Sequence, residues 1–366
     1  MRGRPELYTS YAQDMAFLNT RPKRVSTGAL LVVALLLPFM ITDDLLQLLA
    51  TGYVAAIGAI GLNIVTGYAG QVSLGHAFFL AIGAYTGAAL SGDPDGRVIG
   101  FGVTSLPVWV LASGLVAALA GVIVAPLAVR LRGLYLAIVT LGLVFLGDHV
   151  FREWTELTGG PGVGRPAAVP ELLGVRLDKD GAFLTGAQKL YLVMFVLLVI
   201  FGVLARNLVR SRVGRAFAAV RDRDLAASVI GVDLTKYKVL AFAISSFYAG
   251  VAGALLFVPN GFFDPGSFSL LLSVQYIAMV LIGGAGTISG AIMGALFITL
   301  LPRITRELPA VLPFISGDAT GTFTVFQLEA VLYGVLLIVF LIVEPRGLFG
   351  IWVRVRNYWR TWPFSY

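Results

Sequence analysis

The chain has 366 residues, of which 58% are hydrophobic and only 13% are charged, and its formal net charge is +7. In soluble domains about a quarter of the residues are charged, so the composition excludes an ordinary soluble enzyme and predicts an all-α polytopic membrane protein. The chain contains no cysteine, which excludes a disulfide framework and a thiolate metal site.

Ten apolar runs predict about ten transmembrane or partly re-entrant helices. The first run follows a polar tail at residues 1–24. It resembles a signal peptide but lacks a small-residue cleavage site, so we interpret it as a retained span. The predicted spans are 25–41, 45–66, 73–91, 106–129, 133–150, 187–205, 238–258, 270–284, 287–302 and 323–343. Because some are shorter than the ~20 residues that a full crossing needs, we expect half-helices or re-entrant turns around 66–73 and 284–287.

The distribution of charge predicts the orientation. Ten crossings place both termini on one side, and the segments assigned to that side hold 19 basic and six acidic residues, against eight basic and 13 acidic residues on the other. Cytoplasmic loops are enriched in Lys and Arg, so both termini are predicted to be cytoplasmic, and the net charge of +7 does not indicate nucleic-acid binding. A transmembrane domain at 25–343 would then carry an outer loop at 151–189 and a cytoplasmic loop at 206–238. The cytoplasmic tail at 344–366 is rich in Trp and Arg, which are typical of the lipid headgroup region.

Two short Gly-rich segments interrupt the apolar runs and resemble each other. Residues 67–73 read GYAGQVS and residues 283–289 read GGAGTIS, which suggests a parallel duplication, with a chance match in a Gly-rich chain as the alternative. Broken helices free backbone polar groups, which a membrane tolerates only beside protein or along a water-filled route. We therefore predict a substrate pathway here, with tight helix packing as the alternative. The predicted pathway residues are Asn63, Gly70, Gln71, Ser73, His76, Gln275 and Ser289.

Ionisable residues at membrane depth are few. The two histidines, His76 and His149, have no partner at the spacing of a metal motif, so we predict no metal site. Glu329 lies within the last predicted span, where an acidic side chain is costly and often functional. It is a candidate coupling acid, although it could also reach the outer interface or pair with a base.

The cytoplasmic loop 206–238 is long, basic and amphipathic. It holds eight of the 27 Lys and Arg residues. Two short helices are predicted, the second beginning at Asp224 as N-cap and ending near Gly231. Their apolar positions are Val213, Phe217, Val220, Leu225 and Val229.

The loop fits three functions. The chain has no P-loop sequence, so uphill transport would need an ion gradient or a partner ATPase. A permease driven by a separate ATPase needs a docking element that passes a rigid-body motion into its spans. A basic loop of an ion-coupled secondary transporter and an interfacial helix on anionic lipid are the alternatives.

Six segments together resemble the LivM-type permease of branched-chain amino acid ABC importers, over about residues 30–350. Two of them, RGLYLAIVTLG and EPRGLFG, favour the LivM type over its usual LivH-type partner. The six are GLNIVTGYAGQVSLGHAFFLAIGAY (61–85), RGLYLAIVTLG (132–142), LTGGPGVG (157–164), VGRAFAAVRDRDLAASVIGVDLTKYKVLAFAISSFYAGVAGAL (213–255), VLIGGAGTISGAIMGA (280–295) and EPRGLFG (344–350).

The resemblance implies a multi-pass subunit of the bacterial inner membrane that moves branched-chain amino acids by alternating access. The implied partners are a LivH-type permease, two cytoplasmic ATPase subunits and an extracytoplasmic solute-binding protein, besides membrane lipid. The chain itself would be no enzyme and hold no cofactor, since the partner subunits bind ATP. Urea or short amides on the same machinery, or a secondary transporter with Glu329 as coupling acid, are the alternatives. The implied ATPase contact lies within 213–231, at Gly214, Arg215, Arg221, Asp222, Asp224, Ala226, Ala227 and Gly231.

Overall fold

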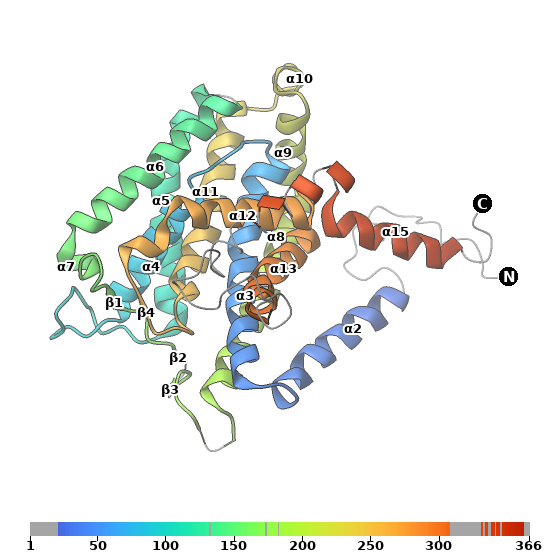
Figure 1. Cartoon of the computed structure of the whole chain (residues 1–366). Helices are drawn as coiled ribbons and strands as arrows, with labels where there is room; N and C mark the ends of the chain where they lie inside the picture. The colour runs from blue at the N-terminus through green and yellow to red at the C-terminus, as the bar shows by residue number, and fades with distance from the viewer. Residues whose placement is uncertain are drawn as a thin grey trace.

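A computed structural model describes residues 21–131, 133–172, 174–181, 183–307, 331, 334–335, 338–340, 342–344 and 346–361. It is built almost entirely from helices (Figure 1), which confirms the predicted all-α membrane fold. The helices long and apolar enough to cross a membrane, among these residues, are α3 (Asp43–Asn63) continued by η2 (Ile64–Tyr68), α5 (Leu106–Arg130), α6 (Leu134–Glu153), α8 (Gly186–Arg210) and α11 (Leu234–Leu256). Shorter apolar helices are α2 (Arg21–Leu36) with η1 (Leu37–Phe39), α4 (His76–Ser91), α12 (Leu270–Gly283) and α13 (Ile288–Glu307).

The first nine predicted spans correspond to these helices. The tenth, 323–343, lies mostly outside the described residues. Glu329 and residues 1–20 lie entirely outside them. The predicted span 73–91 begins late, because residues 69–75 are not helical and α4 starts only at His76.

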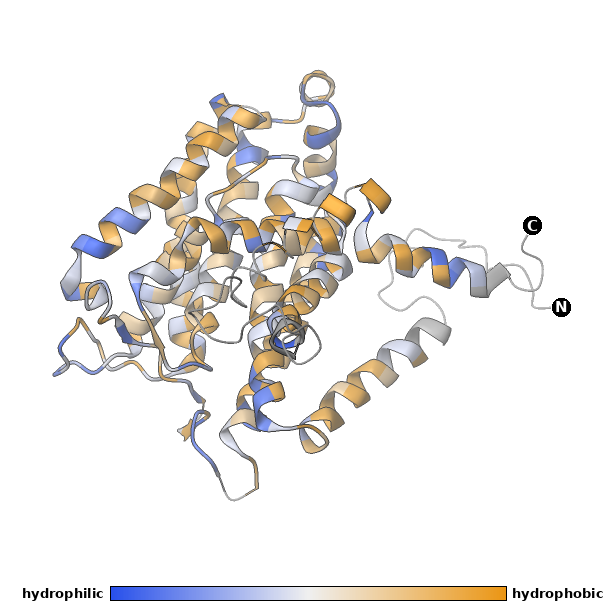
Figure 2. Ribbon diagram, in the orientation of Figure 1, coloured by the Kyte–Doolittle hydropathy of each residue, from blue (hydrophilic) through white to orange (hydrophobic). Residues whose placement is uncertain are grey.

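The centre of the bundle is formed by α11, which packs against α5, α4 and α3. Glycines permit this close approach: a Cβ on Gly83 would lie 2.0 Å from the carbonyl oxygen of Gly250, and one on Gly253 would lie 1.9 Å from that of Leu80. Helices in lipid commonly pack through such small residues. The outer helices α5, α6 and α8 leave much of their surface exposed, and apolar residues cover most of α6 (Figure 2).

The predicted loop 206–238 is mostly helical. The transmembrane helices reach into it, since α8 ends at Arg210 and α11 begins at Leu234. Between them lie α9 (Arg212–Asp222) and α10 (Asp224–Val229), which confirms the two short helices. The predicted N-cap was wrong by one residue. Arg223, with an extended backbone at φ −157°, holds that position and separates the two helices.

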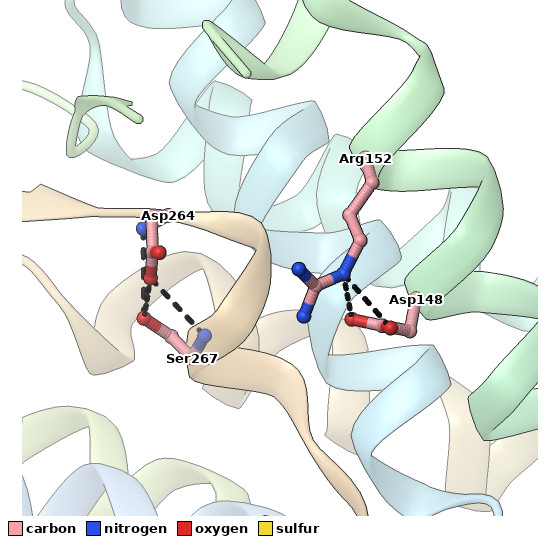
Figure 3. A network of polar contacts seen from close by, with 4 residues as sticks. All are labelled: Asp148, Arg152, Asp264 and Ser267. Carbon is pink, nitrogen blue, oxygen red and sulfur yellow. Dashed lines mark hydrogen bonds and ion pairs between the residues drawn. The ribbon is translucent and has the colours of Figure 1, made fainter. Parts of the chain in front are cut away.

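At the end of the bundle opposite to α9 and α10, short strands and α7 (Thr155–Thr158) form a cover (Figure 1). β1 (Arg165–Pro166) pairs antiparallel with β4 (Phe262–Phe263), and β2 (Glu171–Leu172) pairs antiparallel with β3 (Val175–Arg176). Nearby, the Asp264 carboxylate caps η3 (Pro265–Phe268) by accepting from the Ser267 amide and hydroxyl, beside the Arg152–Asp148 ion pair of α6 (Figure 3).

Arg165 holds this cover to the bundle. Its side chain is buried, and its guanidinium donates to the carbonyl oxygens of Leu157 at 2.6 Å, Ala88 at 2.7 Å and Ile99 at 3.1 Å. Burial lowers the pKa of Arg165 to about 10, so the group remains a cation at neutral pH. The three carbonyls belong to three separate segments, which this one side chain joins.

Candidate functional site

The first Gly-rich segment breaks the helix at the inner end of α3. η2 is a wide π turn, Gly70 has φ +68°, and the backbone amide of Gln71 returns to the carbonyl of Val65. Where the helix is interrupted, side-chain hydroxyls replace the helical acceptors of two backbone amides. The Thr140 hydroxyl accepts from the Leu74 amide, and the Ser73 hydroxyl accepts from the Gly75 amide. Such replacement is what allows irregular backbone at membrane depth.

The second Gly-rich segment makes a tighter turn between α12 and α13. Gly284 and Gly286 have φ values of +119° and +76°, which residues with a side chain rarely adopt. The Thr287 hydroxyl donates 2.8 Å to the carbonyl of Gly284 and closes the turn. Both segments therefore break the apolar helices, the first with a non-helical stretch at residues 69–75 and the second with a tight turn.

Asn63 joins the two turns. Its side chain is completely buried, its Nδ2 donates 2.9 Å to the carbonyl of Thr287, and its Oδ1 accepts 2.8 Å from the amide of Gly286. The turns are so close that a Cβ on Gly67 would lie 2.5 Å from the Gly286 nitrogen. The two similar sequences are thus direct neighbours in space.

Arg221 connects the turns to the short helices α9 and α10. From the end of α9, its Nη1 donates 3.0 Å to the carbonyl of Gly67, and its Nε pairs with Asp222 at 3.1 Å. A Cβ on Gly70 would lie 2.6 Å from the Arg221 Cγ, so the arginine stem lies directly on this glycine. The group Asn63, Gly67, Gly286 and Arg221 is called the turn clamp below.

A cleft of about 270 Å³ opens beside the turn clamp. The first turn, the α5–α6 connection and the α9–α10 junction line it, together with Lys238 of α11. Its charged lining residues are Arg221, Asp222, Arg223, Asp224 and Lys238. Lys238 is buried and lines this cleft.

The predicted ATPase-contact residues differ in exposure. Gly214 and Ala227 are buried and Asp224 is half-buried. The exposed members of the set are Arg215, Arg221, Asp222, Ala226 and Gly231.

The exposed tip of α10 carries an apolar surface whose residues are not among the predicted ATPase-contact residues. Leu225, Val229 and Ile230 are 70%, 86% and 76% exposed. In contrast, Phe217 and Val220 of α9 are buried in the bundle. The sequence pattern counts Leu225 and Val229 among the apolar positions of the two short helices, as it does Phe217 and Val220. The break at Arg223 separates α10 from α9, and the apolar side chains of α10 remain exposed.

The predicted pathway residues fall into three groups. Asn63, Gly70 and Gln71 gather at the turn clamp. Ser73 and His76 lie deeper, where the His76 ring packs on Tyr276 with 4.9 Å between centroids. Gln275 is partly exposed on α12 and Ser289 is exposed on α13.

Two of the pathway residues, and the neighbouring Tyr276, have side-chain groups without a hydrogen-bond partner among the described residues. They are the amide of Gln71, the Nε2 of His76 and the hydroxyl of Tyr276, and all are buried. Buried polar groups are normally paired, so these are the positions where a substrate or a second subunit would find available partners. The described residues contain no group of three or more His, Cys, Asp or Glu that could hold a metal ion.

The chain matches a known family of transport proteins over most of its length. Residues 45–341 match the family model described as the branched-chain amino acid transport system / permease component. No solved structure matches the chain.

Curated relatives carry related descriptions. The high-affinity branched-chain amino acid transport system permease protein LivM of Salmonella typhimurium is 33% identical over 306 residues, which cover 79% of this chain and 70% of the relative. LivM of Escherichia coli gives the same figures. BraD of Pseudomonas aeruginosa, described as a permease of the same kind of system, is 26% identical over 84% of this chain and 95% of the relative. With its polytopic helical fold, the chain therefore belongs to the family of branched-chain amino acid transport system permeases.

Proposed function

We propose that this chain is the LivM-type subunit of an ABC importer of the bacterial inner membrane that carries branched-chain amino acids. The partners would be a LivH-type permease, two cytoplasmic ATPases and an extracytoplasmic solute-binding protein. The names of the relatives support the substrate class. The observation that carries the mechanism is the bond between Arg221 and Gly67, because it connects the cytoplasmic helices to the broken transmembrane segments.

The ATPase would engage the exposed tip of α10 and the polar residues beside it. Leu225, Val229 and Ile230 offer apolar side chains at the most exposed part of this loop, and burying one such side chain in an interface contributes about 1.5–3 kcal/mol. Arg215 adds an exposed positive charge on α9. Apolar anchors with a charged rim are the usual composition of a specific interface.

Motion would then pass from the ATPase into the membrane through the turn clamp. Closure of the ATPases on ATP would displace α9 and α10 together. Arg221 would carry the first Gly-rich turn along, and Asn63 would carry the second. Since α4, α12 and α13 begin or end at these turns, their inner ends would move as units, which is a rigid-body route to alternating access.

The substrate would pass the unwound segment 69–75 and the start of α4. Gln71, His76 and Tyr276 would supply hydrogen-bonding groups that the described residues leave unpaired. Apolar neighbours such as Phe79 and Leu80, which are buried close by in the chain, suit an aliphatic side chain. Selectivity would be set largely by the solute-binding protein.

Co-purification of the ATPase subunits with the tagged permease tests the docking step. Charge reversal by Arg215→Glu should remove the ATPase from the purified complex, because an exposed positive contact becomes repulsive to its partner. Lys236→Glu is the matched control: it makes the same change in charge at an exposed position of α11 and should leave the complex intact. Uptake that persists without any ATPase and collapses with an ionophore would instead identify an ion-coupled transporter.

A further inference from the structure

The last described helix, α15 (Gly347–Thr361), projects sideways from the bundle beyond α12 and α13 (Figure 1). The proposed transport function assigns it no role. Its first turn is fixed firmly: Gly347 has φ +63°, and a Cβ there would lie 2.5 Å from the carbonyl oxygen of Ile282. Arg354 also forms an ion pair with Glu344 just before the helix. The helix therefore leaves the bundle at a defined point and direction.

That point lies beside the turn clamp. Gly347 contacts Gly283 and Gly284 at the end of α12, and the same turn continues to Gly286, close to Arg221. α15 thus begins at the end of the bundle that carries α9 and α10. This is the end at which the basic residues of the sequence accumulate.

One side of α15 is apolar and uncovered. Ile351, Trp352, Val355 and Tyr358 follow helical spacing and are 40%, 54%, 44% and 55% exposed. Such spacing places them on one face, and Figure 2 shows apolar and hydrophilic residues alternating along the helix. A contiguous exposed apolar stripe of this kind marks a surface that binds a protein or a membrane.

The other residues of α15 are basic or neutral. Arg354, Arg356 and Asn357 are exposed, and residues 347–361 contain three arginines and no acidic residue. A protein partner with a docking groove would require complementary acids at defined positions, whereas an anionic lipid surface accepts any such array. The combination of Trp, Tyr and Arg on one short helix is typical of helices that lie in the plane of the membrane interface.

We propose that α15 is an interfacial anchor that binds the anionic lipid surface of the cytoplasmic leaflet. Its apolar face enters the boundary between headgroups and acyl chains, and its arginines contact lipid phosphates. The first turn of α15 is packed on the α12–α13 turn, so the anchor holds the bundle at a fixed height at its mobile cytoplasmic end. This role is independent of which solute is transported.

The absence of cysteine allows a direct test on the full-length chain, co-purified with its partner subunits. Val355→Cys on the apolar face and Asn357→Cys on the polar face are labelled with an environment-sensitive fluorophore. Each complex is placed in nanodiscs of phosphatidylcholine with or without phosphatidylglycerol. In discs with phosphatidylglycerol, the emission of the fluorophore at position 355 should shift to shorter wavelength. Lipids that carry a quencher near the headgroup should remove most of this fluorescence. The label at Asn357 should be quenched by aqueous iodide instead.

A second variant separates charge from apolar burial. The double change Arg356→Gln and Arg360→Gln, combined with the Val355 label, should abolish the difference between the two lipid compositions. Two results would overturn the proposal. Quenching of the Val355 label by iodide in both kinds of disc would mean that the face is in water. Protection of that label from both iodide and lipid quenchers would mean that a protein subunit covers the face.

Discussion

The guanidinium of Arg221 donates a 3.0 Å hydrogen bond to the carbonyl oxygen of Gly67, although 154 positions separate the two residues. The bond joins α9 to the turn that follows the C-terminal end of the transmembrane helix α3. Asn63 extends the connection to the second turn. One arginine and one asparagine thus link the predicted ATPase-docking loop to both breaks in the transmembrane helices.

Removal of the Arg221 donors should uncouple ATP hydrolysis from import. Arg221→Met keeps the stem that packs on Gly70 and loses the charged hydrogen bond, which is worth about 1.5–3 kcal/mol. The complex should still assemble, while the number of ATP molecules hydrolysed per solute imported rises in proteoliposomes. Arg212→Met, on the same helix and exposed, is the control. An unchanged ratio in Arg221→Met would show that the bond does not transmit motion.

Loss of the Asn63 amide should destabilise the permease. Asn63→Ala leaves the part-buried Gly286 amide and Thr287 carbonyl without their side-chain partner, and we expect a loss of about 2–4 kcal/mol. The free energy of unfolding in mixed micelles measures this, with Asn260→Ala as control because Asn260 is exposed in a loop. Equal stability of the two variants would mean that water or a neighbouring group replaces the amide.

The contact between the two turns leaves no room for a methyl group at Gly67. A Cβ there would lie 2.0 Å from the Asn63 Oδ1, so Gly67→Ala must separate the turns or displace Asn63. We expect import to be lost. The matched control is Gly202→Ala in α8, where no atom lies within 4 Å of the new Cβ and where alanine is favoured over glycine by roughly 0.5–1 kcal/mol. Normal import by Gly67→Ala would contradict the close packing of the turns.

The apolar tip of α10 should be required for ATPase binding but not for folding. Val229→Asp changes a side chain that is 86% exposed, so the permease itself should remain as stable as before. The ATPase should no longer co-purify, because the aspartate would have to be buried without a partner in the interface. Val175→Asp in the opposite cover is also exposed and should retain the ATPase. Retention by both variants would place the docking surface elsewhere.

Arg165 should be essential for the outer cover. Arg165→Leu removes the donors of one buried and two part-buried carbonyl groups, and we expect a loss on the order of 3 kcal/mol. Arg152→Leu breaks an exposed ion pair with Asp148 and should cost less than about 1 kcal/mol. The two variants are compared by their free energies of unfolding in mixed micelles and by the rate at which a protease cleaves the loop 151–189. Similar behaviour of both variants would show that the cover does not depend on Arg165.

The membrane class, the first nine spans and the two short helices between α8 and α11 follow from the sequence alone. They follow because apolar periodicity, charge bias and Gly-rich breaks are local properties that a chain shows residue by residue. The tertiary structure alone decided which residues meet. No local pattern indicates that Asn63 binds the second turn, that Arg165 is buried among three carbonyls, or that α10 turns its apolar side outward. Hydrogen bonds between residues up to 224 positions apart depend on how the helices pack. For the same reason, the sequence could name candidate pathway residues but could not place Gln71 at the turn clamp and His76 against Tyr276.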